Sequence, residues 1–136
     1  RSSDLGVAQA AYLDSKEPNL GGIYENVVAQ QLAAQNRQLY YYQTKKRGEV
    51  DFVVDGPDGT AVPIEVKSGS YYHAHAALGH VLDTAEYGVR LGIVFSRGNV
   101  ERNGAVLYLP LYAIWALSDV LGDSCAEGIK LEVKPV

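Results

Sequence analysis

The sequence contains no methionine, a single cysteine and a single tryptophan, and it has no long apolar run. Cys125 alone cannot form an internal disulfide, and it excludes a zinc site built from several cysteines. No segment approaches the roughly 18 consecutive apolar residues of a membrane-spanning helix. The start also lacks the basic and then apolar segments of a signal peptide. These absences predict a cytoplasmic protein without a membrane partner.

A nucleotide-binding loop is missing as well. No Gly-x-x-x-x-Gly-Lys-Ser/Thr segment occurs, so ATP binding by these residues is not predicted. The 136 residues are 47% apolar and 21% charged, which is typical of one globular domain, and we expect a single domain over residues 1–136. Because the chain starts at Arg1, we expect a C-terminal piece of a longer protein. A net charge of -4 argues against a general nucleic-acid coat but permits a local contact surface.

Two segments, residues 48–54 and 62–67, alternate apolar and charged residues with the period of a half-buried strand. The alternation predicts one apolar face in each strand, made of Val50, Phe52 and Val54 in the first and Val62, Ile64 and Val66 in the second. The opposite faces would carry Glu49 and Asp51, then Glu65 and Lys67. If the strands pair as a hairpin, carboxylates and an amine meet on one face. A divalent metal site would gather charges in this way, whereas the alternative is a solvated face with an ordinary ion pair.

The remaining patterns predict a mixed α/β fold with a largely central sheet. Tyr24, Val28 and Leu32 recur at helical spacing, and Glu25 on the edge of that stripe should point partly inward. Helices are expected over 4–13, 23–35, 75–87 and 110–117, and strands over 38–44, 49–54, 61–68, 91–96, 105–109 and, at the end, 129–133. From residue 23 to 117 the predicted order is α-β-β-β-α-β-β-α.

Five ordered motifs carry a resemblance to known proteins: Gly21–Asn26, Leu39–Tyr42, Gly48–Val53, Pro63–Gly69 and Tyr108–Tyr112. Over residues 20–117 the chain resembles the C-terminal domain, of unsettled function, of a family of prokaryotic AAA-type ATPases. A helix Glu, a strand Asp and a Glu-x-Lys strand also resemble the PD-(D/E)xK nuclease superfamily. That resemblance implies a restriction-endonuclease-like mixed sheet flanked by helices. Val50 stands where the superfamily name has proline.

By this resemblance Asp51 and Glu65 would hold Mg²⁺ or Mn²⁺, Lys67 would position or activate the attacking water, and Glu25 would assist. The implied function is a metal-dependent nuclease or a nuclease-derived DNA-binding domain attached to an AAA-type ATPase. Nucleic acid, with DNA favoured, and the ATPase domain of the same chain are the implied partners. The alternative is a non-catalytic protein-interaction or regulatory module of that ATPase with a degenerate site.

Further charged residues have two interpretations each. The predicted strand that carries Glu49 and Asp51 is preceded by a basic turn, which consists of Lys45, Lys46 and Arg47. This turn could contact phosphates or be solvated. Glu49 is expected to be a solvated neighbour more than a metal ligand.

Aromatic and imidazole side chains are interpreted in the same way. Tyr40, Tyr41 and Tyr42 could stack on bases, but tyrosine also suits strands and core edges, and that structural interpretation is favoured. For His73, His75 and His80 a position in a loop or at a helix start is favoured over a zinc site.

Overall fold

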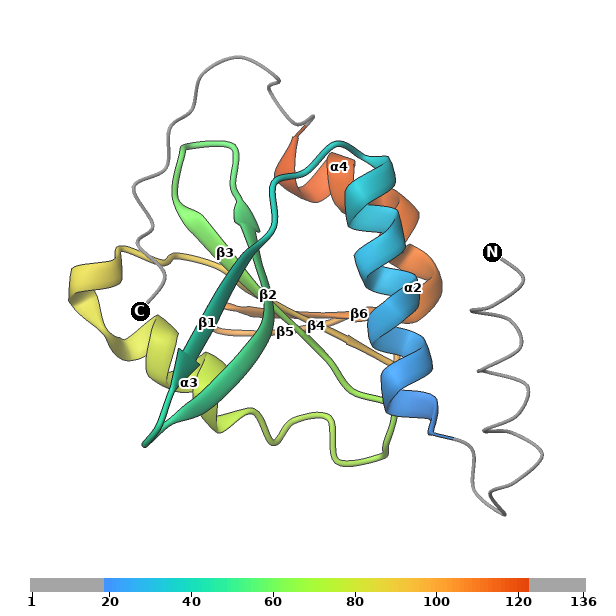
Figure 1. The fold of residues 1–136 in the computed structure, drawn as a ribbon, viewed down its shortest axis with the longest axis horizontal. Coiled ribbons are helices and arrows are strands. Elements are labelled where there is room, and N and C mark those ends of the chain that lie inside the picture. Colours follow the sequence, from blue (N-terminus) through green and yellow to red (C-terminus); the bar gives the residue numbers. More distant parts are fainter. Residues whose placement is uncertain (1–18, 123–136) are drawn as a thin grey trace.

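The computed structural model describes residues 19–122, and Figure 1 shows them as a mixed sheet with helices on both faces. The strands are β1 (Tyr40–Thr44), β2 (Gly48–Asp55), β3 (Ala61–Val66), β4 (Gly92–Ser96), β5 (Glu101–Asn103) and β6 (Val106–Pro110). The helices are α2 (Leu20–Ala34), α3 (Ala76–Asp83) and α4 (Leu117–Leu121), with 3₁₀ turns η1 (Ala85–Tyr87) and η2 (Leu111–Ala116). The helix predicted over 4–13 and the strand predicted over 129–133 lie outside the described residues.

The predicted order of elements is confirmed, with one strand added. β5 lies inside the segment predicted to be a loop, where it pairs antiparallel with β6. Helix α2 starts earlier than predicted because Asn19 caps it, its Oδ1 accepting a hydrogen bond from the Gly22 N–H at 3.2 Å. Helix α3 ends earlier, at Asp83, because Thr84 takes an extended conformation. The last predicted helix is the 3₁₀ turn η2 followed by α4.

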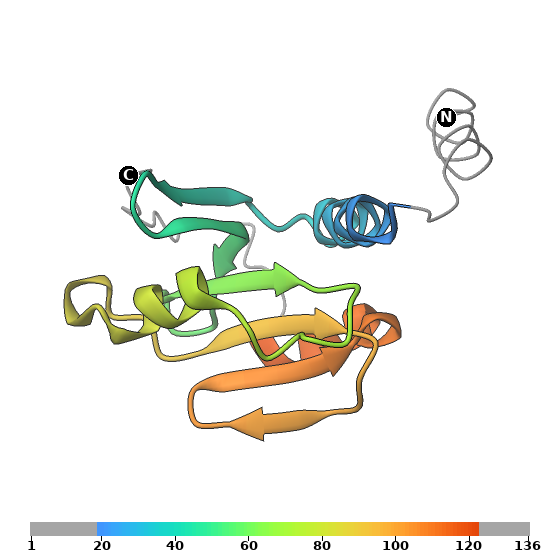
Figure 2. The same ribbon diagram turned by 90° about the horizontal axis from the view of Figure 1, so that it is seen from below.

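The sheet order is β1-β2-β3-β4-β6-β5. β1, β2 and β3 form an antiparallel meander, while β3, β4 and β6 run parallel, and β5 returns antiparallel at the far edge. Figure 2 shows the β1–β2 hairpin and the β5–β6 hairpin at opposite ends of the twisted sheet. Helix α3 makes the crossover between the parallel strands β3 and β4, so the residues at its start lie near the end of β3.

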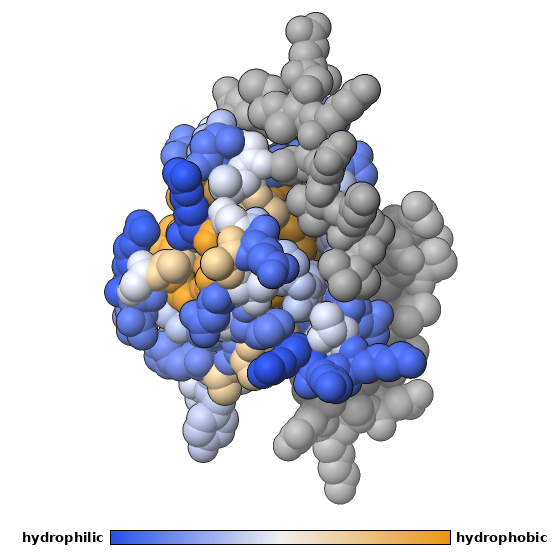
Figure 3. Space-filling view, turned by 90° about the vertical axis from the view of Figure 1, so that its left-hand side faces the viewer, coloured by the Kyte–Doolittle hydropathy of each residue, from blue (hydrophilic) through white to orange (hydrophobic). Residues whose placement is uncertain are grey.

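Each face of the sheet has its own core. On one face Val28 and Leu32 of α2, both fully buried, pack with Phe52 and with η2 and α4. On the other face α3 covers the sheet through Ala77, Leu78 and Val81. Figure 3 shows the side of the molecule that lies at the left of Figure 1, where hydrophilic residues surround a smaller group of apolar ones. Among the described residues no helix is both long and apolar enough to cross a bilayer.

A buried arginine joins the end of α2 to α4. Arg37 is only 8% exposed, and its Nη2 donates to the Gly122 carbonyl at 2.7 Å. The same guanidinium reaches Ser118 Oγ at 3.4 Å, and its Nε donates to Gln35 Oε1 at 3.1 Å. Hydrogen bonds from a charged donor are stronger than neutral ones. Arg37 therefore fixes α4 against the helix that carries Glu25.

A β-bulge in β2 corrects the predicted strand faces. Tyr40 pairs with Val53 and Tyr42 pairs with Val50, so the single residue between the tyrosines opposes both Asp51 and Phe52. The extra residue breaks the alternation. Val50 packs with Val53 on the α3 face, whereas Phe52 and Val54 pack on the α2 face. The predicted single face of Val50, Phe52 and Val54 is therefore wrong.

Candidate functional site

The sequence-predicted site residues line one open pocket of about 300 Å³. It lies where the start of β2, next to the turn of the β1–β2 hairpin, comes together with the end of β3 and the starts of α2 and α3. Glu25, Asp51, Glu65 and Lys67 all line it, and so do Glu49 and His75. Four elements that are distant in sequence thus place four carboxylates, an amine and an imidazole around one cavity.

Strand β3 provides Glu65, and Lys67 follows directly after its last residue, as the alternation predicts. Ile64 and Val66 face the core on the α2 side, so the two charged residues share the other face. Glu65 is only 4% exposed, and its Oε2 lies 3.2 Å from Lys67 Nζ. A buried carboxylate of this kind needs a partner, and Lys67 supplies it while its own side chain stays more than a third exposed.

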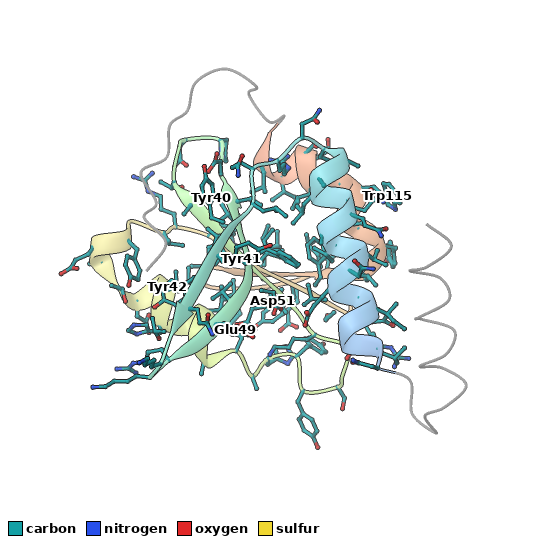
Figure 4. The ribbon with its side chains drawn as sticks, viewed as in Figure 1. Tyr40, Tyr41, Tyr42, Glu49, Asp51 and Trp115 are labelled. Carbon is teal, nitrogen blue, oxygen red and sulfur yellow. The ribbon has the colours of Figure 1, made fainter. Side chains whose placement is uncertain are left out.

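Asp51 is held at the point where β2 and β3 separate. The two strands pair from Asp55 and Ala61 as far as Phe52 and Ile64. Beyond it the Val66 N–H donates to the Asp51 Oδ2 at 2.8 Å, which takes the place of a backbone acceptor. The bulge thus directs this side chain into the gap between the strands. In Figure 4 Asp51 lies on the side of β2 that faces α2.

Glu25 forms the outer wall from α2. It remains largely exposed, yet its carboxyl lines the pocket as its position beside the apolar stripe predicts. Partial burial raises its pKa, and the negative charges of Asp51 and Glu49 raise it further. Lys67 acts in the opposite direction. The helix therefore brings a fourth carboxylate within electrostatic reach of Asp51 and Glu49 on β2.

The buried carboxylates of the pocket lie in surroundings that disfavour their ionised forms. Burial raises the pKa of Asp51, although the hydrogen bond from Val66 and the charge of Lys67 oppose that change. Burial also raises the pKa of Glu65, and here too the positive charge of Lys67 opposes that change. Desolvation and mutual repulsion are the two effects that disfavour ionised carboxylates. A positive ion placed among these oxygens would relieve both.

His75 is the pocket residue that sequence reasoning missed as a site residue. It was expected in a loop or at a helix start, and it does occupy the N-cap position of α3, where its side chain makes no capping bond. Instead its Nε2 lies 2.6 Å from the Oη of Tyr108, a β6 residue that is 2% exposed. When His75 is protonated, its positive charge lowers the pKa of Glu65. The available signal was a histidine opening the helix that follows the Glu-x-Lys strand.

The other candidates fall outside the pocket lining, with one exception. Glu49, which was expected to be a solvated neighbour, is exposed but does line the pocket. The basic turn is fully exposed, closed by a bond from the Arg47 N–H to Thr44 Oγ1 at 3.0 Å. His73 pairs with Glu101 at 3.0 Å, and His80 lies in the last turn of α3. The three histidines thus have different local surroundings.

Two of the pocket side chains, Asp51 and Glu65, are carboxylates, the type of ligand that a hard divalent cation takes. Within residues 19–122 no three His, Cys, Asp or Glu side chains are grouped closely enough to hold a metal by themselves. Mg²⁺ does not need such a cage, because it is usually held by one or two carboxylates together with waters and substrate phosphates. Asp51 and Glu65 can provide those two carboxylates.

Comparison with known proteins identifies the domain without assigning it an activity. No curated protein and no solved structure matches the chain. The family model described as a domain of unknown function, DUF4143, matches residues 20–114, from the first turn of α2 into η2. Every pocket residue named above lies inside that match. The chain therefore belongs to the DUF4143 family of domains of unknown function.

Proposed function

We propose that this domain is a metal-dependent nuclease of the PD-(D/E)xK type, with a restriction-endonuclease-like fold, carried at the C-terminal end of an AAA-type ATPase. The observation that carries the proposal is the convergence of Glu25, Asp51, Glu65 and Lys67 on one pocket. Carboxylates that share an open cavity with a lysine are suited to phosphodiester hydrolysis, which requires both charge neutralisation and an activated water.

Asp51 and Glu65 would hold Mg²⁺ or Mn²⁺. The ion, when bound, supplies positive charge for the phosphate and lowers the pKa of a bound water. Asp51 Oδ2 is fixed by the Val66 N–H, which leaves the other carboxylate oxygen for a cation.

Lys67 Nζ, which lies 3.2 Å from Glu65 Oε2, would donate to a phosphate oxygen or to the attacking water. Glu25, with its raised pKa, is suited to receive a proton on the open side of the pocket.

A cleavage assay tests the proposal directly. The protein is incubated with supercoiled plasmid and with single-stranded DNA in Mg²⁺ and in Mn²⁺, beside Lys67→Ala and Asp51→Asn. The matched control is Asp83→Asn, which removes an exposed carboxylate at the end of α3 and outside the pocket. We expect metal-dependent cutting by the wild type and the control, and none by the two pocket variants. Cutting that survives in either pocket variant would refute the assigned roles.

Thermal unfolding in Mg²⁺ provides a readout that does not depend on cutting. A ligand that binds only the folded state raises the melting temperature by mass action. We expect Mg²⁺ to raise the melting temperature of the wild type and of Asp83→Asn, but not the melting temperature of Asp51→Asn. Protection without cutting would indicate a nuclease-derived binding domain.

A second candidate function is a non-catalytic module that docks on the ATPase or on another protein. The observation that favours it is a pair of exposed aromatics on η2, Tyr112 at 77% and Trp115 at 69% exposure. In Figure 4 Trp115 lies to the right of α2, on the other side of that helix from Asp51. This candidate predicts neither cutting nor protection by Mg²⁺.

A further inference from the structure

Three consecutive tyrosines in β1 have three different environments. Tyr42 is 7% exposed and packs with α3, and Tyr40 is half-buried against the same cluster. Tyr41 points to the opposite face of the strand and is 65% exposed. Core packing accounts for Tyr40 and Tyr42 but not for Tyr41.

The bulge places Tyr41 directly beside the candidate site. Because its neighbours pair with Val50 and Val53, Tyr41 lies opposite Asp51 and Phe52. Side chains directly opposite each other on one face have Cβ atoms about 5 Å apart. Figure 4 shows Tyr41 on the side of β1 that faces α2, close to Asp51. The exposed ring is therefore adjacent to the carboxylate that would hold the cation.

The surface continues from Tyr41 toward the end of the hairpin. Gln43 is exposed on the same face, opposite Glu49. Beyond it the turn contributes Lys45, Lys46 and Arg47, all exposed and without an ion pair to any residue of the described chain. An aromatic ring, an amide and a group of cations in that order match the chemistry of a nucleic-acid strand, with its bases and its phosphates.

The charges around Tyr41 select a base over a phosphate as its partner. Asp51 and Glu49 on the facing strand would repel a phosphate at this position, whereas the neutral face of a base meets no such repulsion. A base within a continuous duplex has both faces covered by its neighbours, so it must be unpaired to stack on a side chain. These conditions are met by a single strand whose base lies on Tyr41 and whose neighbouring phosphate contacts the cation that Asp51 and Glu65 would hold.

We propose that Tyr41 is a base-stacking residue and that the substrate is single-stranded nucleic acid or an unpaired segment of a duplex. The inference rests on the proposed function and adds to it the substrate class. It assigns the basic turn to phosphates beyond the stacked base.

Binding to labelled oligonucleotides, measured by fluorescence anisotropy in Ca²⁺ to suppress cutting, tests the inference. The probes are a thymidine oligonucleotide, the same length of abasic strand, which keeps the phosphates but has no bases, and a duplex. The variants are Tyr41→Phe, which keeps an aromatic face, and Tyr41→Ala, with Tyr112→Ala as the matched control at another exposed tyrosine. Melting temperatures verify folding.

We expect the wild type to prefer the thymidine strand over both other probes. Tyr41→Ala should weaken binding of that strand by about tenfold or more and leave binding of the abasic strand unchanged. Tyr41→Phe and Tyr112→Ala should bind as the wild type does. Equal losses on the thymidine and abasic strands, no loss on either, or no nucleic-acid binding by the wild type would overturn the inference.

The two proposals fail in distinguishable ways. If Tyr41→Ala binds as the wild type does, the stacking role of Tyr41 is refuted. If Lys67→Ala at the same time no longer cuts, the proposed nuclease activity still stands. If the wild type neither cuts nor binds any probe, both proposals fall.

Discussion

Asp51 is the residue at which function and stability should conflict most clearly. Its carboxylate accepts a hydrogen bond from the Val66 N–H at 2.8 Å, which stabilises the fold, while burial raises its pKa, which means that the ionised form is disfavoured. Asp51→Asn keeps an oxygen acceptor and removes the charge. Asp51→Ala removes both. We therefore expect Asn to be more stable than the wild type at neutral pH, and Ala to be less stable than Asn.

The magnitude of the difference between Asn and Ala follows from the hydrogen bond. A buried N–H left without an acceptor costs about 1–3 kcal/mol. For a domain of this size, each kcal/mol shifts the melting temperature by about 4–8 °C. Thermal and urea unfolding of the three proteins, without divalent cations, measure this difference directly.

The pH dependence separates the charge from the hydrogen bond. A folded pKa above the ordinary 3.8 means that the folded state binds the proton more tightly than the unfolded state. The wild type therefore loses stability as the pH rises through the interval between 3.8 and the folded pKa, whereas asparagine does not titrate. The advantage of Asp51→Asn should be absent at low pH, grow across that interval and then stay constant. An Asn variant that is less stable than the wild type at neutral pH would refute the reasoning.

Two buried polar groups give further predictions, both measured by urea unfolding. Arg37→Ala should lower the free energy of unfolding by roughly 2–4 kcal/mol, because the charged hydrogen bonds that join α2 to α4 are lost; Arg90→Ala, with its side chain 78% exposed, should change it little. Tyr108→Phe should cost about 1 kcal/mol, because the buried hydroxyl pairs with His75, while Tyr112→Phe should be neutral. A loss no larger than that of the matched control would contradict either account.

Regular local structure made part of the site predictable from sequence. Glu65 and Lys67 share a face because β3 alternates without interruption. Glu25 could be placed because the helical stripe of Val28 and Leu32 fixes the rotation of α2. In both cases the periodicity of the backbone is sufficient to say which way a side chain points.

The parts that escaped prediction depend on long-range pairing. The bulge at Asp51 arises from the register of β1 against β2, and it moves Val50 to the other core without any mark in the alternation. His75 reaches the pocket because the loop between β3 and α3 brings the start of α3 beside the end of β3. Strand β5 is exposed at all three residues, so it carries no apolar pattern. Only the folded arrangement specifies these contacts.

The bulge also determines where the domain can accept changes in length. Between the basic turn and Asp51, losing or gaining one residue would reverse the face of every following side chain in β2. The carboxylate would exchange its place with an apolar neighbour, and both cores would be disturbed together. The turn at 56–59, at the other end of β2, bears no such constraint. Natural variation in length among related domains should therefore concentrate there and avoid the segment that leads to the site.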